Sequence, residues 1–151
     1  MVNLIKKSSW RIPRKFIEQW MQATCAQLGR ELKKSSYKKA LGLETVVVFV
    51  TQAQIQGLNK TYRQKNKATD ILSFDGDGEE TLGELVLCGE LVESQAKAHG
   101  LSTQQELGYL LIHGLLHLLG FEHENGGPQA KEMMALQDRV FEKLWPRFFK
   151  S

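Results

Sequence analysis

The sequence predicts a single α+β domain in which a small mixed β-sheet packs against helices. The chain has 151 residues, of which 42% are hydrophobic, enough to bury the core of one domain. Short β-branched runs that indicate strands are mixed with segments of helical periodicity. Two of these strands follow each other near the middle of the chain, which favours an α+β architecture. No repeat or linker divides the chain, so residues 1–151 are expected to form one domain.

The first half of the chain predicts two strands and two helices. Residues 2–6 (VNLIK) indicate a short strand. Apolar residues then recur at helical spacing as far as Leu32, with Pro13 at the opening of the helix, where its missing N–H does no harm. The run TVVVFVT at 45–51 is the clearest strand, and residues 52–63 follow as a helix.

The second half predicts a strand pair and three helices. The strands are expected at 71–75 and 83–90, with turn residues between them. The helices are expected at 91–99, where Gly100 ends the first, at Thr103–Leu119, and from Pro128 to just before Pro146. The second of these helices is apolar on nearly all sides after its first turn, so we expect it in the middle of the domain. The apolar tail LWPRFF is expected in the core or at a contact surface.

Charge is distributed unevenly along the chain. Residues 1–70 hold 14 Lys and Arg against 4 Asp and Glu, a balance of +10, whereas residues 71–151 hold 6 against 13, a balance of −7. This asymmetry indicates either a polyanionic partner on one face or two surface halves that attract each other in the fold.

Composition also bears on location and redox state. No run of 18 apolar residues exists, so no membrane span is expected. The N-terminal residues lack the charged-then-apolar order of a signal peptide, so we expect a cytoplasmic protein. Cys25 and Cys88 lie far apart and form no C-x-x-C pair, which predicts inert reduced thiols, with a disulfide or a fourth metal ligand as alternatives.

Three of the four histidines fall within eleven residues. His113 and His117 are four apart on a predicted helix, so their rings project from one face. Gly120 can end that helix in a left-handed conformation and let the chain bring His123 back toward them. Three imidazoles without a nearby cysteine predict a catalytic metal site with an open position, because structural zinc is normally closed by four ligands. His99 lies outside this window and is expected on the surface.

The spacing H-x-x-x-H-x-x-G-x-x-H is that of the metzincin zinc proteases, which predicts a zincin-like fold around a central metal-binding helix. Those proteases carry a glutamate base directly after the first histidine. This chain has Gly114 there, which can move no proton, and Glu122 and Glu124 do not occupy the same position. The sequence therefore disfavours peptide hydrolysis.

A basic segment supplies groups suited to a phosphodiester. Arg63, Lys65 and Lys67 follow Tyr62 closely, at the end of a predicted helix. The planar guanidinium of arginine binds phosphate with two hydrogen bonds and can stabilise charge that builds in a transition state. Tyr62 could stack on a base. The alternative is a solvated charge cluster.

Taken in order, three stretches resemble the YbeY family of bacterial endoribonucleases that mature ribosomal RNA. They are LNKTYRQKNKATDILSF at 58–74, LGEL at 82–85 and HGLLHLLGFEH at 113–123, and the likeness runs from about Leu58 to Met133. The resemblance implies a metal-dependent, single-strand-specific ribonuclease that acts in 3′-end maturation of 16S rRNA and in ribosome quality control. It implies zinc as the metal, with nickel as the alternative. Its implied partners are the small ribosomal subunit, the GTPase Era and a small-subunit ribosomal protein.

Carried over by position, the resemblance makes the three histidines the metal ligands and Arg63 the residue needed for cleavage. The chain departs from the family at Ala68, where proline is common, and at Glu84 and Glu122, where aspartate is common. The longer acidic side chains put the placement of any supporting carboxylate in doubt, but no ligand changes.

Two further mechanisms and two further functions stay open at this point. The metal could activate a water or bind the scissile phosphate while Arg63 neutralises the developing charge, and attack by the RNA 2′-OH with the same metal is a variant. An RNA-binding assembly factor with a purely structural metal would need the basic face but not the open metal position. A metallopeptidase would need a proton-transferring base that Gly114 does not provide.

Overall fold

The computed structural model describes residues 2–63, 70–121 and 127–149. In chain order the elements are β1 (Val2–Lys6), α1 (Arg14–Glu31), α2 (Ser35–Leu41), β2 (Glu44–Phe49), α3 (Gln52–Arg63), β3 (Ile71–Asp75), β4 (Thr81–Leu87), α4 (Gly89–His99), α5 (Thr103–Leu118) and α6 (Gly127–Phe148). The predicted α+β class is confirmed.

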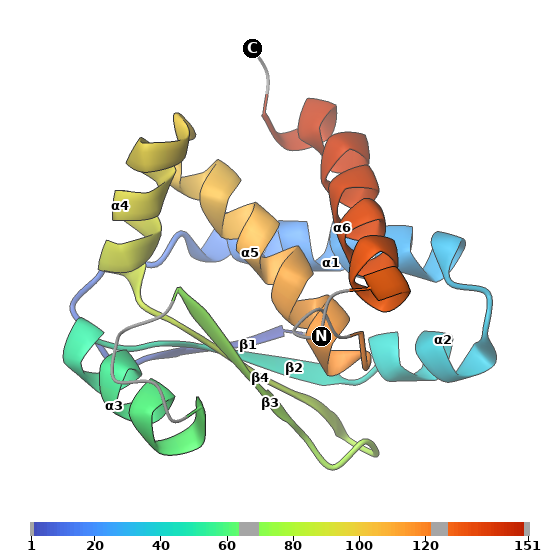
Figure 1. Cartoon of the computed structure of the whole chain (residues 1–151), viewed down its shortest axis with the longest axis horizontal. Helices are drawn as coiled ribbons and strands as arrows, with labels where there is room; N and C mark the ends of the chain where they lie inside the picture. The colour runs from blue at the N-terminus through green and yellow to red at the C-terminus, as the bar shows by residue number, and fades with distance from the viewer. Residues whose placement is uncertain (1, 64–69, 122–126, 150–151) are drawn as a thin grey trace.

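Four strands form one mixed sheet in the order β1-β2-β4-β3. β1 and β4 both run parallel to β2, and β3 pairs with β4 antiparallel, with Ser73 opposite Leu85. The strand pair expected near the middle of the chain is therefore present. Figure 1 shows α1, α5 and α6 over one face of the sheet and α3 against the other.

The alternation of strand residues explains these two layers. Val47 and Phe49 lie in the large core cluster with α1, α5 and α6, whereas Val46 and Val48 lie in a smaller cluster with Ile55 of α3. Because successive side chains of a strand point to opposite faces, a strand that is apolar throughout is buried on both. This explains the uninterrupted run in β2.

α5 is the central helix. It packs against α1, α4, α6, β3 and β4, and apart from its N-terminal turn most of its side chains are buried. The indole N–H of Trp20 donates a hydrogen bond of 2.9 Å to the carbonyl of Gly108, which joins α1 to α5. No helix in the described part of the chain is both long and apolar enough to cross a membrane.

Three elements differ most from the sequence-based expectations. The short helix α2 has a single buried residue, Leu41, and so carries no amphipathic signal. β4 covers 81–87 instead of 83–90, because Gly89 already begins α4. α6 continues through Pro146 to Phe148, although a stop before the proline was expected.

Aromatic burial explains the continuation of α6. The apolar residues of the LWPRFF tail pack in or against the core: Leu144 and Phe149 are buried, and Phe149 contacts Trp20 at a ring-centroid distance of 5.4 Å. The Phe149 N–H also donates to the carbonyl of Trp145 at 2.8 Å. These contacts offset the hydrogen bond that Pro146 cannot make in the last turn.

Candidate metal centre

The two ends of α5 are fixed by local hydrogen bonds. Ser102 and Gln105 form a capping box at its start, and the helix ends just before Gly120, whose φ of 101° is left-handed. The N–H groups of Gly120 and Phe121 donate to the carbonyls of His117 and Leu116, each at 3.0 Å. The predicted left-handed stop at Gly120 is confirmed. His123, which follows it, lies outside the described residues.

His113 and His117 lie together on one face of α5, as their spacing predicts. Their rings are half-buried, with centroids 4.6 Å apart, and the two Nε2 atoms are separated by 3.1 Å. Two nitrogens bound to one zinc ion at about 2.0–2.1 Å in a tetrahedron would lie about 3.3 Å apart. The donor pair therefore fits a shared metal ion. Among the described residues alone, no three His, Cys, Asp or Glu side chains are grouped to hold a metal, so a three-ligand site needs a further ligand from outside the described residues.

The position of His113 is set by a residue that sequence reasoning missed. Gln137, on α6, is 1% exposed, and its Oε1 lies 2.8 Å from Nδ1 of His113. An amide oxygen only accepts hydrogen bonds, so Nδ1 of His113 carries the proton and Nε2 keeps its lone pair on the side of His117. The signal in the sequence was a single glutamine within the apolar stripe of α6.

Tyr109 stands one helical turn before His113 on α5. Its hydroxyl donates to Oδ1 of Asp138 at 2.9 Å. Desolvation, followed by the hydrogen bond to Asp138, raises the pKa of Tyr109 to about 12, while a weaker hydrogen bond from Gln137 acts in the opposite direction. The phenol is therefore neutral at physiological pH, and it links α5 to α6 beside the histidines.

Gly114 is a packing position. A Cβ atom built there would lie 2.7 Å from Cδ2 of Leu85 and 2.8 Å from Cδ1 of Ile71, closer than side-chain contacts allow. A side chain at position 114 would therefore point into the sheet. The residue after the first histidine cannot serve as the proteases' glutamate does, which supports the sequence argument against peptide hydrolysis.

Of the predicted RNA-contacting residues, Tyr62 is the one whose side chain the structure describes, in the last turn of α3. Tyr62 is 64% exposed and its ring meets Phe74 edge-on at 5.2 Å. Arg63 is the last residue of α3, and its side chain is outside the described part of the structure, as are Lys65 and Lys67. The chain re-enters the described part at Asp70, which lines the same hollow as His113.

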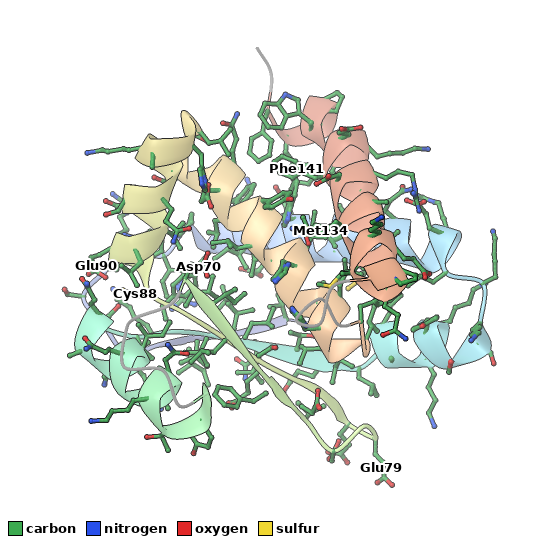
Figure 2. The ribbon with its side chains drawn as sticks, viewed as in Figure 1. Asp70, Glu79, Cys88, Glu90, Met134 and Phe141 are labelled. Carbon is green, nitrogen blue, oxygen red and sulfur yellow. The ribbon has the colours of Figure 1, made fainter. Side chains whose placement is uncertain are left out.

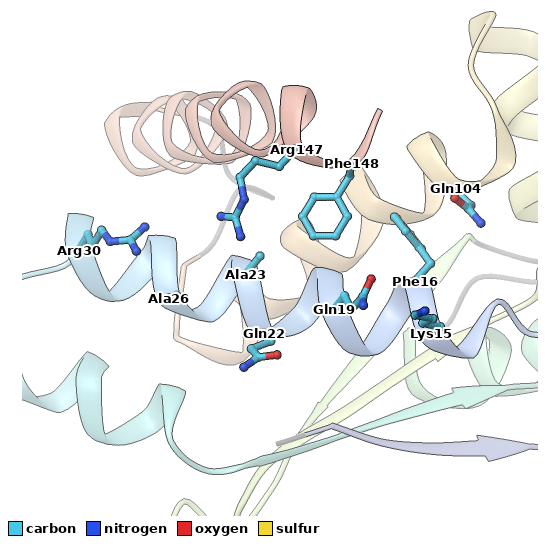
Figure 3. Close-up of a pocket in the computed structure, with 10 residues that line it drawn as sticks. All are labelled: Lys15, Phe16, Gln19, Gln22, Ala23, Ala26, Arg30, Gln104, Arg147 and Phe148. Carbon is cyan, nitrogen blue, oxygen red and sulfur yellow. The ribbon is translucent and has the colours of Figure 1, made fainter. Parts of the chain in front are cut away.

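Two hollows differ in their relation to the histidines. A cavity of about 450 Å³ between α4, α5 and α6 has His113 in its wall. A larger hollow of about 820 Å³ lies between α1 and α6, where no histidine lines it (Figure 3). The larger one carries Lys15, Arg30 and Arg147, and no carboxylate lines it among the described residues.

His99 and the cysteines behave as expected. His99 is 56% exposed, and its Nδ1 lies 2.7 Å from Oε1 of the buried Glu106. Cys25 and Cys88 are free thiols, and burial is the largest cause that raises the pKa of each. The Cys88 thiol donates to Glu90 at 3.2 Å (Figure 2).

Comparison with known proteins decides the family. The family described as Endoribonuclease YbeY matches residues 4–145. The chain belongs to the YbeY family. An "Endoribonuclease YbeY" of Bdellovibrio bacteriovorus is 46% identical over 143 residues, covering 95% of this chain and 94% of that protein. The Aquifex aeolicus "Endoribonuclease YbeY" is 34% identical over 145 residues, covering 93% and 90%.

A solved structure agrees with this assignment. The solution structure of TM1509 from Thermotoga maritima matches with a TM-score of 0.64 and 26% identity, over 97% of this chain and 91% of that one. The zincin-like expectation fits the YbeY family. Of the three departures noted from the family pattern, Glu84 lies exposed on β4 opposite Phe74. Ala68 and Glu122 lie outside the described residues.

Proposed function

We propose that this protein is a metal-dependent endoribonuclease that cleaves single-stranded RNA in 3′-end maturation of 16S rRNA and in ribosome quality control. Relatives that cover nearly the whole chain bear the name Endoribonuclease YbeY, which supports an endoribonuclease role. The observation that carries the metal-dependent part is the 3.1 Å separation of the His113 and His117 Nε2 atoms. Oriented imidazole pairs of this kind are typical of catalytic zinc sites.

His113, His117 and His123 are the proposed ligands, with zinc as the metal and nickel as the alternative. A divalent ion bound there would supply Lewis-acid chemistry, polarising a phosphoryl oxygen and acidifying water. Gln137 holds His113 in the tautomer whose Nε2 can donate its lone pair. Three protein ligands leave a position open for substrate.

Arg63 is the proposed catalytic residue beside this centre. Its guanidinium neutralises the charge that builds on the phosphate as the phosphodiester bond breaks. Its position at the end of α3, seven residues before Asp70 in the wall of the hollow that holds His113, supports this role. Tyr62, with 64% of its surface exposed, is free to stack on a base, and Lys65 and Lys67 are proposed phosphate contacts.

The distribution of positive charge suggests a second place of contact for a long RNA substrate. The hollow between α1 and α6, with its three cations, offers a second place for the phosphate backbone of a long substrate (Figure 3). The proposed partners are the 16S rRNA precursor in the small ribosomal subunit, together with the GTPase Era and a small-subunit ribosomal protein. The proposed location is the cytoplasm.

The experiment is incubation of the purified protein with rRNA precursor, with and without a chelator. Cleavage should stop on chelation, return with zinc, and be absent from a His113→Ala variant. An Arg63→Ala variant should keep its metal and lose cleavage. Cleavage that survives both chelation and His113→Ala points to a contaminating nuclease and removes the support for the proposal. Ribosome maturation that proceeds normally with a folded, metal-free protein would favour an assembly factor with a structural metal.

A further inference from the structure

The cavity of about 450 Å³ beside His113 is lined by apolar and polar side chains that have no part in the proposed metal site. It lies between α4, α5 and α6, and its volume falls within the roughly 300–1,000 Å³ of small-molecule sites. Leu101, Met134 and Phe141 are its large apolar lining residues. Tyr109 and Glu106 supply polar groups. His113, one of the proposed metal ligands, also lines this cavity.

The apolar lining residues on α6 are partly exposed to solvent. Met134 is 39% exposed, and among the described residues only Tyr62 is a more exposed large hydrophobic side chain. Phe141 is half-buried and meets the ring of Tyr109 edge-on at 5.2 Å, so part of its face borders the cavity. Figure 2 shows Met134 and Phe141 on α6, with Asp70 at the beginning of β3. A thioether beside an aromatic ring is a favourable surface for a flat, polarisable group.

The polar lining residues include a carboxylate that can accept further hydrogen bonds. Glu106 is 3% exposed, and its one side-chain partner in the described structure is His99, at 2.7 Å. A carboxylate accepts about four hydrogen bonds, so it can accept more from N–H groups in the cavity. A flat group with N–H donors on its edge is complementary to the apolar lining residues and to the Glu106 carboxylate. Each nucleobase is such a group.

We propose that this cavity binds one unpaired nucleobase of the RNA, next to the phosphate that is cleaved. The base lies against Met134 and Phe141 and directs its N–H groups toward Glu106, so its phosphate is held beside His113. This inference rests on the proposed ribonuclease function and adds a reason for single-strand specificity: a paired base is not available to enter the cavity.

The test combines abasic RNA with a variant that fills the cavity. Single-stranded oligonucleotides that span a mapped cleavage site carry one abasic nucleotide at successive positions. For the wild type, removal of the base at one position beside the cleaved phosphate should lower kcat/KM about tenfold, as expected for one stacked base. Removal of bases further away should have little effect.

Met134→Arg places a long cation in the cavity from an exposed position, so the fold is retained. It should lower kcat/KM on intact RNA about tenfold and abolish the sensitivity to the abasic position. Ala135→Arg is the matched control, because the neighbouring residue is exposed on the same helix and does not line the cavity. It should behave as the wild type. Melting temperatures of both variants verify folding.

The proposal is overturned if no abasic position changes kcat/KM by more than twofold, or if Met134→Arg stays as sensitive as the wild type. Failure of the ribonuclease function is recognised separately, by the absence of cleavage in the wild type. In that case the binding of single-stranded oligonucleotides with one abasic nucleotide at successive positions, measured by fluorescence anisotropy on the wild type and on Met134→Arg, still decides whether the base at one position enters the cavity.

Discussion

The contact between Gln137 and His113 predicts a measurable loss of metal affinity in a Gln137→Leu variant. Gln137 Oε1 lies 2.8 Å from Nδ1 of His113, and the side chain is 1% exposed. Leucine has a similar volume, so the substitution removes the acceptor and leaves little cavity. A buried N–H without an acceptor costs about 1–3 kcal/mol. Part of this cost can be avoided by moving the imidazole proton to Nε2, the atom that the metal needs.

Loss of such a supporting contact typically lowers metal affinity by about 10–100-fold. We therefore expect Gln137→Leu to bind zinc about 10–100-fold more weakly in a competition titration with a chromophoric chelator. Gln137→Glu, which keeps an acceptor oxygen toward Nδ1, should stay within about threefold of the wild type. If Gln137→Leu binds zinc as tightly as the wild type, the tautomer argument for His113 is wrong.

Two further predictions concern stability. Because the folded state raises the pKa of Tyr109 to about 12, first by desolvation and then through Asp138, the unfolded chain loses this proton at lower pH than the folded one. The contribution of Tyr109 to the free energy of unfolding is therefore complete below about pH 10 and is lost as the pH rises toward 12. Chemical denaturation should show this decline in the wild type and a smaller one in Tyr109→Phe; equal slopes would refute it. Gly114→Ala should lower the melting temperature by about 2–4 °C, because overpacking against β3 and β4 costs about 1–3 kcal/mol and better helix propensity returns about 1 kcal/mol. Gly29→Ala in α1, where a Cβ meets nothing within 4 Å, is its control and should raise the melting temperature; an increase in both variants would contradict the packing role of Gly114.

Most of the fold was predictable because its elements have strong local signals. β1 and α3 have the expected bounds, and α5 differs by one residue at its C-terminal end. The errors occur where long-range packing outweighs local preference. Pro146 is a stop signal, yet burial of the aromatic side chains after it keeps α6 helical. The sheet order, with β4 between β2 and β3, is a long-range property that no local pattern contains.

The sequence predicted the metal-binding chemistry of the candidate site but not the residue that positions His113. The spacing of His113 and His117 on a helix fixed their common face, and Gly120 marked the end of that helix. Gln137 lies 24 residues after His113 on another helix, so only the packing of α6 against α5 brings the two together. The same packing creates the cavity that joins Met134 to Glu106.

Metal content tests the central claim most directly. Protein purified without added chelator is measured for zinc and nickel by mass spectrometry, together with His113→Ala and His117→Ala variants that have been shown to be folded. We predict one metal ion per wild-type chain, a large loss in both variants, and a melting temperature that falls when the ion is removed from the wild type. A wild-type protein that binds no stoichiometric metal, or histidine variants that retain it at full occupancy, would contradict the account.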